Sequence, residues 1–370
     1  MDESSAYNIR KSFSFFSIAD AILLATLFLF LCLLCSCKEA GQQSSAQKAR
    51  EDDPVTLTDT VMGTVAQATL YGVGKERAGQ LLERVKELET ECLSGKLDSA
   101  EVSAINARVA MADGEEVEIS PELYKLLQSC LQISGDSLGA FDVTLGRLCR
   151  LWNMDEIASG NARGMVPSDE EIRRAMDHCG FEKLILLGEN RILPEPGMAL
   201  ELGSVGKGYA LDCLHEMIVR WGSSEDRAGV IALGGSIMTF GEKAPGIPWR
   251  VGIKDPDDSA GIIGYLELYG ENYISTSGDY ERFFEQNGER YHHILDPETG
   301  YPARSGLRSV TILAANGFLS DALSTACFVL GAERGMKLAD QYGAEVLMVN
   351  EEGEILLSDG MREIFHAATP

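Results

Sequence analysis

The feature that most constrains the fold is the alternation of two hydrophobic periods along residues 55–370. Glu76–Cys92 repeats leucine and valine at helical spacing, whereas Val61–Leu70 alternates apolar and polar side chains as a half-buried strand does. Strand-like segments are too many for a helix bundle, and some neighbouring pairs could form hairpins. The pattern therefore predicts an α+β or mixed α/β fold without fixing its topology.

Caps and turns place the remaining expected elements. Ser168–Glu171 is a capping box that opens a helix stopping near Gly180, and Gly206–Trp221 is a second strong helix. Ser320 or Asp321 is expected to cap a third helix, which Gly331 ends. The expected strands are Lys183–Leu187, Val230–Phe240, Trp249–Ile253, Ser309–Ala314, Ala344–Val349 and Glu354–Leu357.

The charge balance limits the kinds of partner. The 370 residues include 32 basic and 57 acidic side chains, a formal net charge of -25, so the surface should repel nucleic acid. We therefore expect no nucleic-acid partner. Any phosphate ligand would need local positive charge from a metal ion, a lysine or backbone amides.

The N-terminus has the pattern of an export signal. Arg10 and Lys11 precede an apolar run over about Ala19–Leu34, whose length suits a signal peptide, although length alone also allows an uncleaved membrane anchor. The segment Leu34–Cys37 resembles the bacterial lipoprotein processing signal, in which cleavage precedes a lipidated cysteine. Cys37 is the expected lipidation site, with Cys32 and Cys35 as rival candidates.

This interpretation divides the chain into a signal peptide over residues 1–36, a lipidated polar tether over residues 37–54 and a folded part over residues 55–370. It places the protein in a bacterial cell envelope, anchored to a membrane by lipid and facing the periplasm or extracytoplasmic side. Whether that membrane is the inner or the outer one is left open.

Six cysteines remain in the folded part, and each stands alone in its segment. The absence of a CxxC pair and of His/Cys ligand spacing makes a zinc site an unfavourable interpretation. Most of these cysteines occupy apolar positions of helical stretches, which favours buried thiols over disulfides.

Two glycine-containing segments have residue choices that packing does not require. Ala140-Phe141-Asp142-Val143-Thr144 follows a glycine-rich bend, and taken alone this segment favours a turn with a cap. Glu201–Tyr209 places three glycines and Lys207 at the start of the second helix. A helix N-terminus with an adjacent lysine is suited to a phosphate, although the spacing is neither that of a P-loop nor that of a dinucleotide fingerprint.

Two further segments carry polar side chains suited to chemistry. His292 and His293 precede an Asp-Pro pair, and on a strand only one of them can face a given site. A histidine of near-neutral pKa suits removal of a proton from a hydroxyl. Asp321 and Thr325 lie four residues apart, on one helical face, and supply oxygen ligands of the kind that magnesium prefers. An N-cap aspartate and a threonine bonded to its own helix are the alternative.

Together these segments resemble the ApbE-type FAD:protein FMN transferases, and the likeness covers nearly all of Thr60–Phe365. The matching pieces, in order, are Met62-Gly63-Thr64, Ala140–Thr144, Leu202–Tyr209, Gly234-Gly235, Trp249–Ile253, Ser275–Gly278, His293–Pro297 with Thr299-Gly300, and Asp321–Thr325.

The resemblance implies an α+β, T-fold-like architecture of two similar halves with the nucleotide in a cleft between them. It implies magnesium held by a backbone oxygen at Ser204, by Asp321 and by Thr325. FAD would be bound by Met62, Ala140, Phe141, Asp142, Glu201, Lys207, His293 and Ile294.

The reaction implied by the family is a phosphoryl transfer. An acceptor hydroxyl attacks the FMN phosphorus, AMP leaves, and FMN remains bound to a protein threonine or serine through a phosphoester. Our hypothesis makes His293 the base for that hydroxyl and counts Asp321 among the catalytic groups. The acceptor is expected to be an exported or membrane-bound redox subunit.

Two departures and two alternatives accompany the resemblance. The family usually has aspartate where this chain has Glu201, and a polar residue where it has Ala232. The first change could shift a nucleotide contact and the second could remove one. Attack by water would instead make a magnesium-dependent FAD pyrophosphatase, and a flavin-binding lipoprotein without turnover is a third interpretation.

Overall fold

The computed structural model describes residues 54–368 apart from residues 112–113, 223–226 and 259. The predicted signal peptide, almost all of the tether and the predicted lipidation site Cys37 lie outside these residues. Within the described part of the chain, every helix is too short or too polar to cross a membrane.

The centre of the molecule is an eight-stranded antiparallel sheet with the order β1-β2-β6-β7-β10-β13-β14-β15. Its strands are β1 (Val55–Val61), β2 (Thr64–Tyr71), β6 (Ala228–Leu233), β7 (Ser236–Phe240), β10 (Asn272–Gly278), β13 (Leu307–Ala314), β14 (Glu345–Asn350) and β15 (Ile355–Leu357).

The sheet consists of two halves with the same order of elements. In each half two neighbouring strands are followed by helices and then by two more neighbouring strands: β1 and β2 with β6 and β7, and β10 and β13 with β14 and β15. The helices between these pairs include α2 (Lys75–Glu87) and α8 (Gly206–Arg220) in the first half, and α9 (Gly317–Leu330) and α10 (Ala332–Gln341) in the second. The predicted α+β architecture of two similar halves is confirmed.

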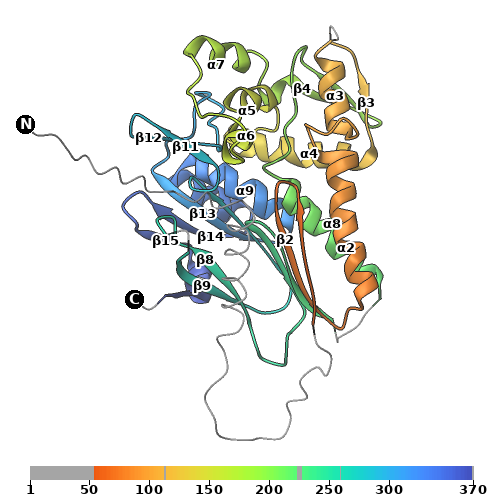
Figure 1. Cartoon of the computed structure of the whole chain (residues 1–370), viewed down its shortest axis with the longest axis vertical. Coiled ribbons are helices and arrows are strands. Elements are labelled where there is room, and N and C mark those ends of the chain that lie inside the picture. The colour runs from red at the N-terminus through yellow and green to blue at the C-terminus, as the bar shows by residue number, and fades with distance from the viewer. Residues whose placement is uncertain (1–53, 112–113, 223–226, 259, 369–370) are drawn as a thin grey trace, which may run out of the picture.

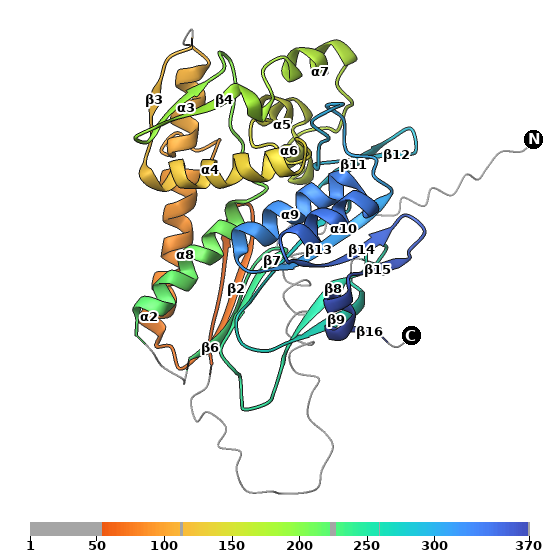
Figure 2. The same ribbon diagram turned by 180° about the vertical axis from the view of Figure 1, so that it is seen from behind.

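The two faces of the large sheet are covered differently (Figures 1 and 2). Helices α8, α9 and α10 lie on one face, and a small sheet of β8 (Trp249–Lys254), β9 (Ile262–Leu268) and β16 (Phe365–Ala367), with α11 (Asp359–Ile364), lies on the other. Adjacent residues of β10 show why both faces are apolar: Tyr273 joins the core under the helices, and Ile274 joins the core under the small sheet.

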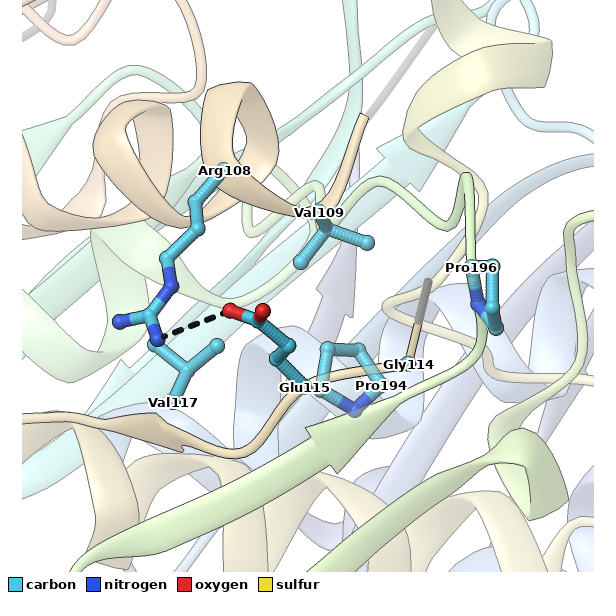
Figure 3. Close-up of a pocket in the computed structure, with 7 residues that line it drawn as sticks. All are labelled: Arg108, Val109, Gly114, Glu115, Val117, Pro194 and Pro196. Atoms are coloured by element: carbon cyan, nitrogen blue, oxygen red, sulfur yellow. Dashed lines mark ion pairs between the residues drawn. The ribbon is translucent and has the colours of Figure 1, made fainter. Parts of the chain in front are cut away.

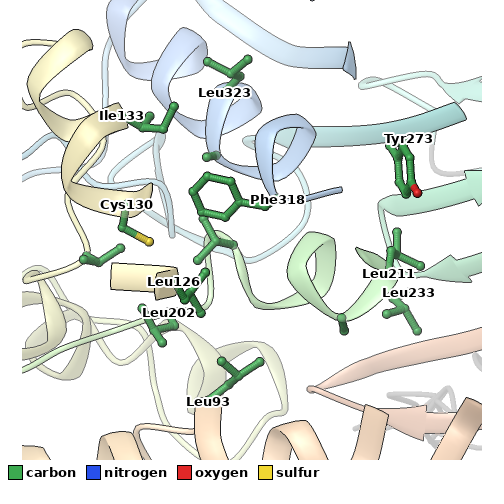
Figure 4. Close-up of a cluster of buried hydrophobic side chains, with 14 of the residues drawn as sticks. Leu93, Leu126, Cys130, Ile133, Leu202, Leu211, Leu233, Tyr273, Phe318 and Leu323 are labelled. Carbon is green, nitrogen blue, oxygen red and sulfur yellow. The ribbon is translucent and has the colours of Figure 1, made fainter. Parts of the chain in front are cut away.

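The main core joins the large sheet to the helices (Figure 4). Leu211 of α8, Phe318 and Leu323 of α9 and Leu233 of β6 are all buried in it, together with side chains of α4 (Pro121–Asp136). This packing fixes α8 against α9. The polar residues at the N-terminal ends of these two helices are therefore held in a defined relation.

A helical region covers one end of the molecule in both views (Figures 1 and 2). It contains α3 (Glu101–Val109), α4, α5 (Gly146–Trp152), α6 (Met154–Ala158) and α7 (Asp169–Met176), with the short helices η1 (Leu88–Leu93) and η2 (Phe181–Lys183). A sheet of β3 (Val117–Glu118), β5 (Arg191–Pro194) and β4 (Leu184–Gly188), and the hairpin of β11 (Phe283–Gln286) and β12 (Glu289–His292), accompany these helices.

Trp152 of α5 is the centre of a separate cluster in this region. Its indole N–H donates to the carbonyl of Gly300 at 2.8 Å, and its ring stacks on Tyr291 of the β11–β12 hairpin with centroids 5.8 Å apart. A shallow hollow near α3 and β5, lined by residues such as Arg108 and Pro196, contains none of the predicted site residues (Figure 3).

Several expected elements need correction. Val61–Leu70 is not one strand, because the hairpin turn at Met62 and Gly63 separates β1 from β2, and both turn residues have positive φ. Val230–Phe240 is likewise two strands, since Gly234 at φ 58° makes the turn between β6 and β7. Apolar periodicity continues across such tight turns, so it does not reveal them.

The ends of two expected helices also differ. The α-helical part of Glu76–Cys92 ends at Glu87, and the last turns form the π-helix η1. Helix α9 begins one turn earlier than predicted, because Asn316 is the N-cap and accepts a hydrogen bond from the Leu319 N–H at 2.8 Å. Asp321 is therefore inside the helix and is free for another role.

The six cysteines of the described residues are free thiols. Four of them are buried and Cys149 and Cys213 are half-buried, and burial raises the pKa of Cys179 and Cys213 to about 11. The prediction of buried thiols is confirmed.

Candidate functional site

The N-terminal ends of α8 and α9 meet at two glycines, and this contact positions Asp321. A Cβ atom on Gly208 would lie 2.0 Å from the carbonyl oxygen of Gly317. The close approach lets the Gly208 N–H donate to Oδ2 of Asp321 at 2.9 Å. Gly208 is therefore needed for the packing of α8 against α9.

Asp321 has partners from two other elements, β7 and α8, although its side chain is only 7% exposed. The Ser236 hydroxyl of β7 donates to Oδ1 at 2.9 Å, and the Lys207 Nζ lies 3.6 Å from Oδ2. A buried carboxylate is stable only when hydrogen bonds or cations replace its lost water. These partners replace the lost water and fix both oxygens of Asp321.

The segment before α8 forms a compact turn. The Leu202 carbonyl accepts from the N–H groups of Val205 and Gly206, and Lys207 Nζ donates to the Gly203 carbonyl at 3.3 Å. Glu201 caps the turn, because its Oε1 accepts from the Gly203 N–H at 3.0 Å. Burial raises the pKa of the Glu201 carboxyl. Lys207 thus places a cation beside the N-terminus of a fifteen-residue helix.

Thr325 lies one turn after Asp321 on α9, as predicted from the spacing. Its hydroxyl is 3.4 Å from the Ser277 hydroxyl of β10, which also lies 2.8 Å from that of Ser324. Thr325 is only half-buried, whereas Ser324 is fully buried. Ser277 therefore holds the outer hydroxyl in place from the sheet.

The predicted magnesium ligands fit that ion by their chemistry. They are the Asp321 carboxylate, the Thr325 hydroxyl and the backbone oxygen of Ser204, which lies in the turn before α8. All are hard oxygen donors, and magnesium takes few protein ligands of this kind. Each carboxylate oxygen of Asp321 accepts one hydrogen bond, so lone pairs remain for a cation. Residues 54–368, where described, hold no group of three or more His, Cys, Asp or Glu side chains arranged for a metal.

The two neighbouring histidines have different surroundings. His292 is buried, its Nε2 lies 3.1 Å from the Ala303 carbonyl and its Nδ1 accepts from the Ile294 N–H, so it supports the local fold. His293 is half-buried, and its Nδ1 is a buried atom without a hydrogen-bond partner among the described residues. An unsatisfied buried nitrogen is rare and indicates a place for a ligand.

The electrostatics around His293 keep its ring neutral. Burial and then the charge of Arg282 lower its pKa to about 3, and the charge of Lys207 acts in the same direction. The backbone N–H of His293 also donates to the backbone carbonyl of Arg282 at 3.0 Å. His293, Arg282 and Lys207 therefore form one electrostatic neighbourhood.

The segment Ala140–Thr144 is fixed by its own aspartate. Oδ1 of Asp142 accepts from the Thr144 N–H and hydroxyl at 2.7 Å, and Oδ2 accepts from the Phe181 N–H at 2.9 Å. Burial raises the pKa of Asp142, and these hydrogen bonds oppose the rise. The Phe141 side chain is only 1% exposed and belongs to the main core. Only the main chain of Phe141 is left to contact a ligand.

Met62 occupies the β1–β2 turn at φ 49°, and its N–H donates to Glu89 of η1 at 2.9 Å. In the described residues no hydrogen bond or ion pair joins Met62 or Asp142 to the Asp321 group. Lys207 contacts both Asp321 and the Gly203 carbonyl, and the Gly203 N–H donates to Glu201. Thr325 lies on the same helix as Asp321. His293 is linked to this group by the charge of Lys207, which lowers the pKa of His293.

Sequence reasoning missed several neighbours of the predicted residues. Ser236 follows the quoted Gly234-Gly235 pair, but its bond to Asp321 spans 85 residues and has no local signal. A cluster of charges was also missed: Asp155 of α6 pairs with both Lys96 and Arg282. Burial opposes ionisation of Asp155, but these two cations outweigh it and lower its pKa to about 2.

Comparison with known proteins identifies the family. The sequence model of the ApbE family matches residues 62–348. A FAD:protein FMN transferase of Treponema pallidum is 30% identical over 353 residues, which cover 90% of this chain and 92% of that protein.

Two solved structures are similar over most of the chain. The ApbE protein of Thermotoga maritima has a TM-score of 0.75 at 34% identity, covering 84% of this chain and 99% of that one. The apo form of the Pseudomonas stutzeri flavinyl transferase ApbE has a TM-score of 0.72 at 30% identity, covering 88% and 100%. By its sequence and by its fold, the chain belongs to the ApbE family.

Proposed function

We propose that this chain is a magnesium-dependent FAD:protein FMN transferase. It moves the FMN part of FAD to a threonine or serine hydroxyl of an acceptor protein, and AMP is released. Membership of the ApbE family and the transferase names of its relatives support the reaction. The structural observation that carries the proposal is the buried Asp321 carboxylate, which β7 and α8 orient beside Lys207.

The charge of the substrate explains the choice of residues. Lys207 and the N-terminus of α8 provide positive potential for the pyrophosphate of FAD in an otherwise acidic protein. Asp321, Thr325 and the Ser204 carbonyl would hold magnesium, which when bound neutralises charge that develops on the pyrophosphate oxygens. Ser236 and Ser277 orient the two side chains of this set.

In the transfer, the acceptor oxygen forms a bond to the FMN phosphorus while the bond from that phosphorus to the AMP oxygen breaks. The acceptor hydroxyl proton goes to His293, whose ring is neutral and whose Nδ1 has no partner among the described residues. A bound pyrophosphate would offset the charges of Arg282 and Lys207, which lower the pKa of His293. Substrate binding would thus make His293 a stronger base.

The proposed location is the bacterial cell envelope. The N-terminal sequence, with its charged residues, apolar run and Cys37, supports a lipid anchor on the extracytoplasmic side. A flavin acceptor in that compartment would be an exported or membrane-bound redox subunit.

The test is to incubate the purified protein with FAD, Mg²⁺ and a candidate acceptor, and then to run a denaturing gel. Covalently bound flavin remains fluorescent on the acceptor band, and Asp321→Asn is expected to abolish it. Release of AMP without flavin on any acceptor would instead identify a pyrophosphatase. Absence of AMP release would identify a flavin-binding protein without turnover.

A further inference from the structure

A second cleft lies in the helical region, at the end of the molecule where α3, α5 and α7 lie in both views (Figures 1 and 2). It has a volume of about 500 Å³ and contains none of the predicted site residues. Its lining is Asn106, Ala110, Arg147, Arg150, Leu151, Glu171, Arg174, Ala175, Gly197 and Met198. A volume of this order suits a small-molecule ligand.

Three arginines in this cleft are held in the same way. The Nε of Arg147 donates to the Gly197 carbonyl, that of Arg150 to the Gly146 carbonyl at 3.1 Å, and that of Arg174 to Glu170 at 2.7 Å. Among the described residues none of their Nη groups has a hydrogen bond or an ion pair. Each guanidinium is therefore oriented through one edge and leaves its other edge open.

Most other arginines of the described chain use their Nη groups. Arg84, Arg250 and Arg308, for example, pair them with carboxylates. In a protein with a formal net charge of -25, acidic partners are abundant. Three neighbouring arginines with open Nη edges are therefore not explained by surface ion pairing.

The acidic side chains close to the cleft are already engaged. Glu171 accepts from the Ser168 N–H and hydroxyl in the capping box of α7, at 2.9 Å and 2.6 Å. Glu170 pairs with both Arg173 and Arg174. The positive charges of Arg147 and Arg150 are left without a described counter-ion.

Part of the remaining lining is apolar, and it is firmly supported. Met198 is buried, and Leu151 and Ala175 are half-buried. Asn106 braces the wall, since its amide donates to the Leu200 carbonyl at 2.9 Å and accepts from the Leu200 N–H at 2.7 Å. Paired Nη groups of arginine match the oxygens of a phosphate, and an apolar wall suits the body of a nucleoside.

From this arrangement we infer that the cleft binds a small phosphate monoester, of the size and chemistry of a nucleoside monophosphate, at a site separate from the Asp321 site. The arginine Nη groups contact the phosphate, and Leu151, Ala175 and Met198 contact the apolar body. The lining residues Gly197 and Met198 lie shortly before Glu201 in the chain, so an occupant would lie near the segment that carries the proposed nucleotide site.

The test is calorimetric titration of the full-length protein with AMP. To weaken binding at the proposed active site, it is done in a Lys207→Gln background. We expect AMP to bind there, and adenosine to bind at least about tenfold more weakly. Adding Arg150→Gln and Arg174→Gln together should weaken AMP binding by about tenfold or more.

Arg334→Gln is the matched control. Its Nε donates to the carbonyl four residues earlier, as that of Arg150 does, and it lies on α10 outside the cleft. Arg334→Gln should leave AMP binding unchanged. The inference is wrong if the Lys207→Gln protein does not bind AMP, if adenosine binds equally well, or if Arg334→Gln has the same effect as the cleft variants.

A separate readout distinguishes this inference from the proposed function. In an otherwise native protein, the Arg150→Gln, Arg174→Gln variant should retain flavin transfer at saturating FAD, because neither residue belongs to the Asp321 site. Loss of AMP binding with retained transfer supports a second site. Loss of transfer to the same extent as AMP binding would show that the cleft is part of the active site, contrary to the inference.

Discussion

Replacement of Gly208 by alanine tests whether the contact of α8 with α9 builds the site. The added Cβ would lie 2.0 Å from the Gly317 carbonyl oxygen and 2.7 Å from the Cβ of Asp321. Both neighbours belong to helix α9, which is fixed in the main core, so they cannot move aside as a flexible side chain would. The helices must separate, and the hydrogen bond from the Gly208 N–H to Asp321 must lengthen or break.

The expected magnitude follows from three terms. Overpacking costs about 1–3 kcal/mol, and loss of a hydrogen bond to a buried carboxylate costs about 1.5–3 kcal/mol. The higher helix propensity of alanine stabilises the variant by about 1 kcal/mol. The net loss is about 1.5–5 kcal/mol, which for a domain of this size lowers the thermal midpoint by roughly 2–8 °C.

Gly206→Ala is the matched control, because it lies on the same helix and its Cβ would meet only Leu93 at 3.7 Å, an ordinary contact. Thermal unfolding followed by circular dichroism compares the two variants, and the flavin-transfer assay reports on Asp321. Gly208→Ala should be less stable than Gly206→Ala and should lose transfer. Equal midpoints for the two variants would refute the reasoning, since they would show that α9 accommodates the added methyl group.

The remaining predictions concern the same site and its surroundings. Asp321→Asn should remove the Mg²⁺-dependent rise in the thermal midpoint and lower flavin transfer by about a hundredfold or more. The control Asp340→Asn, on the exposed face of α10, should change neither quantity. A Mg²⁺-induced shift that survives in Asp321→Asn would place the metal elsewhere. Ser236→Ala should lower the free energy of unfolding, measured by urea titration, by about 1–3 kcal/mol, because it leaves a buried oxygen of Asp321 without its donor. If the variant is as stable as the unaltered protein, water replaces the hydroxyl. Burial lowers the pKa of His292 to about 4, so between its unfolded pKa of about 6.5 and pH 4 the unfolded chain binds the extra proton and the folded protein does not. The free energy of unfolding should therefore fall as pH falls through this window, by up to about 1.4 kcal/mol per pH unit. In His292→Gln the fall should be shallower. Identical slopes in the two proteins would show that other groups cause the fall.

The α+β class and most elements could be predicted from local sequence. Helix α7 has its whole capping box within Ser168–Glu171, and α8 begins at Gly206 as predicted. These signals act over a few residues, so the sequence contains them completely. The paired strands of β6 and β7 could not be separated, because Gly234 and Gly235 interrupt the apolar pattern only briefly.

The site could be predicted in part, and the reason differs between residues. Asp321 and Thr325 share a helical face, which their spacing of four residues determines. The resemblance selected His293 over His292, and the different hydrogen-bond partners of the two rings could be seen only in the structure. The family resemblance supplied FAD and magnesium as expectations. Neither periodicity nor spacing indicated Arg282 or Asp155, whose pairing joins segments 127 residues apart.

What the sequence by itself determined about this protein is therefore local: where most helices lie, which residues carry oxygen or nitrogen atoms suited to a ligand, and an acidic charge balance from which we expect no nucleic-acid partner. The tertiary structure decided which of these groups meet. Asp321 is held by Gly208 and Ser236, which are 113 and 85 residues away, because two helices approach closely over a sheet that joins both halves of the chain. Such contacts depend on the packing of the whole core, and no short segment of sequence contains that information.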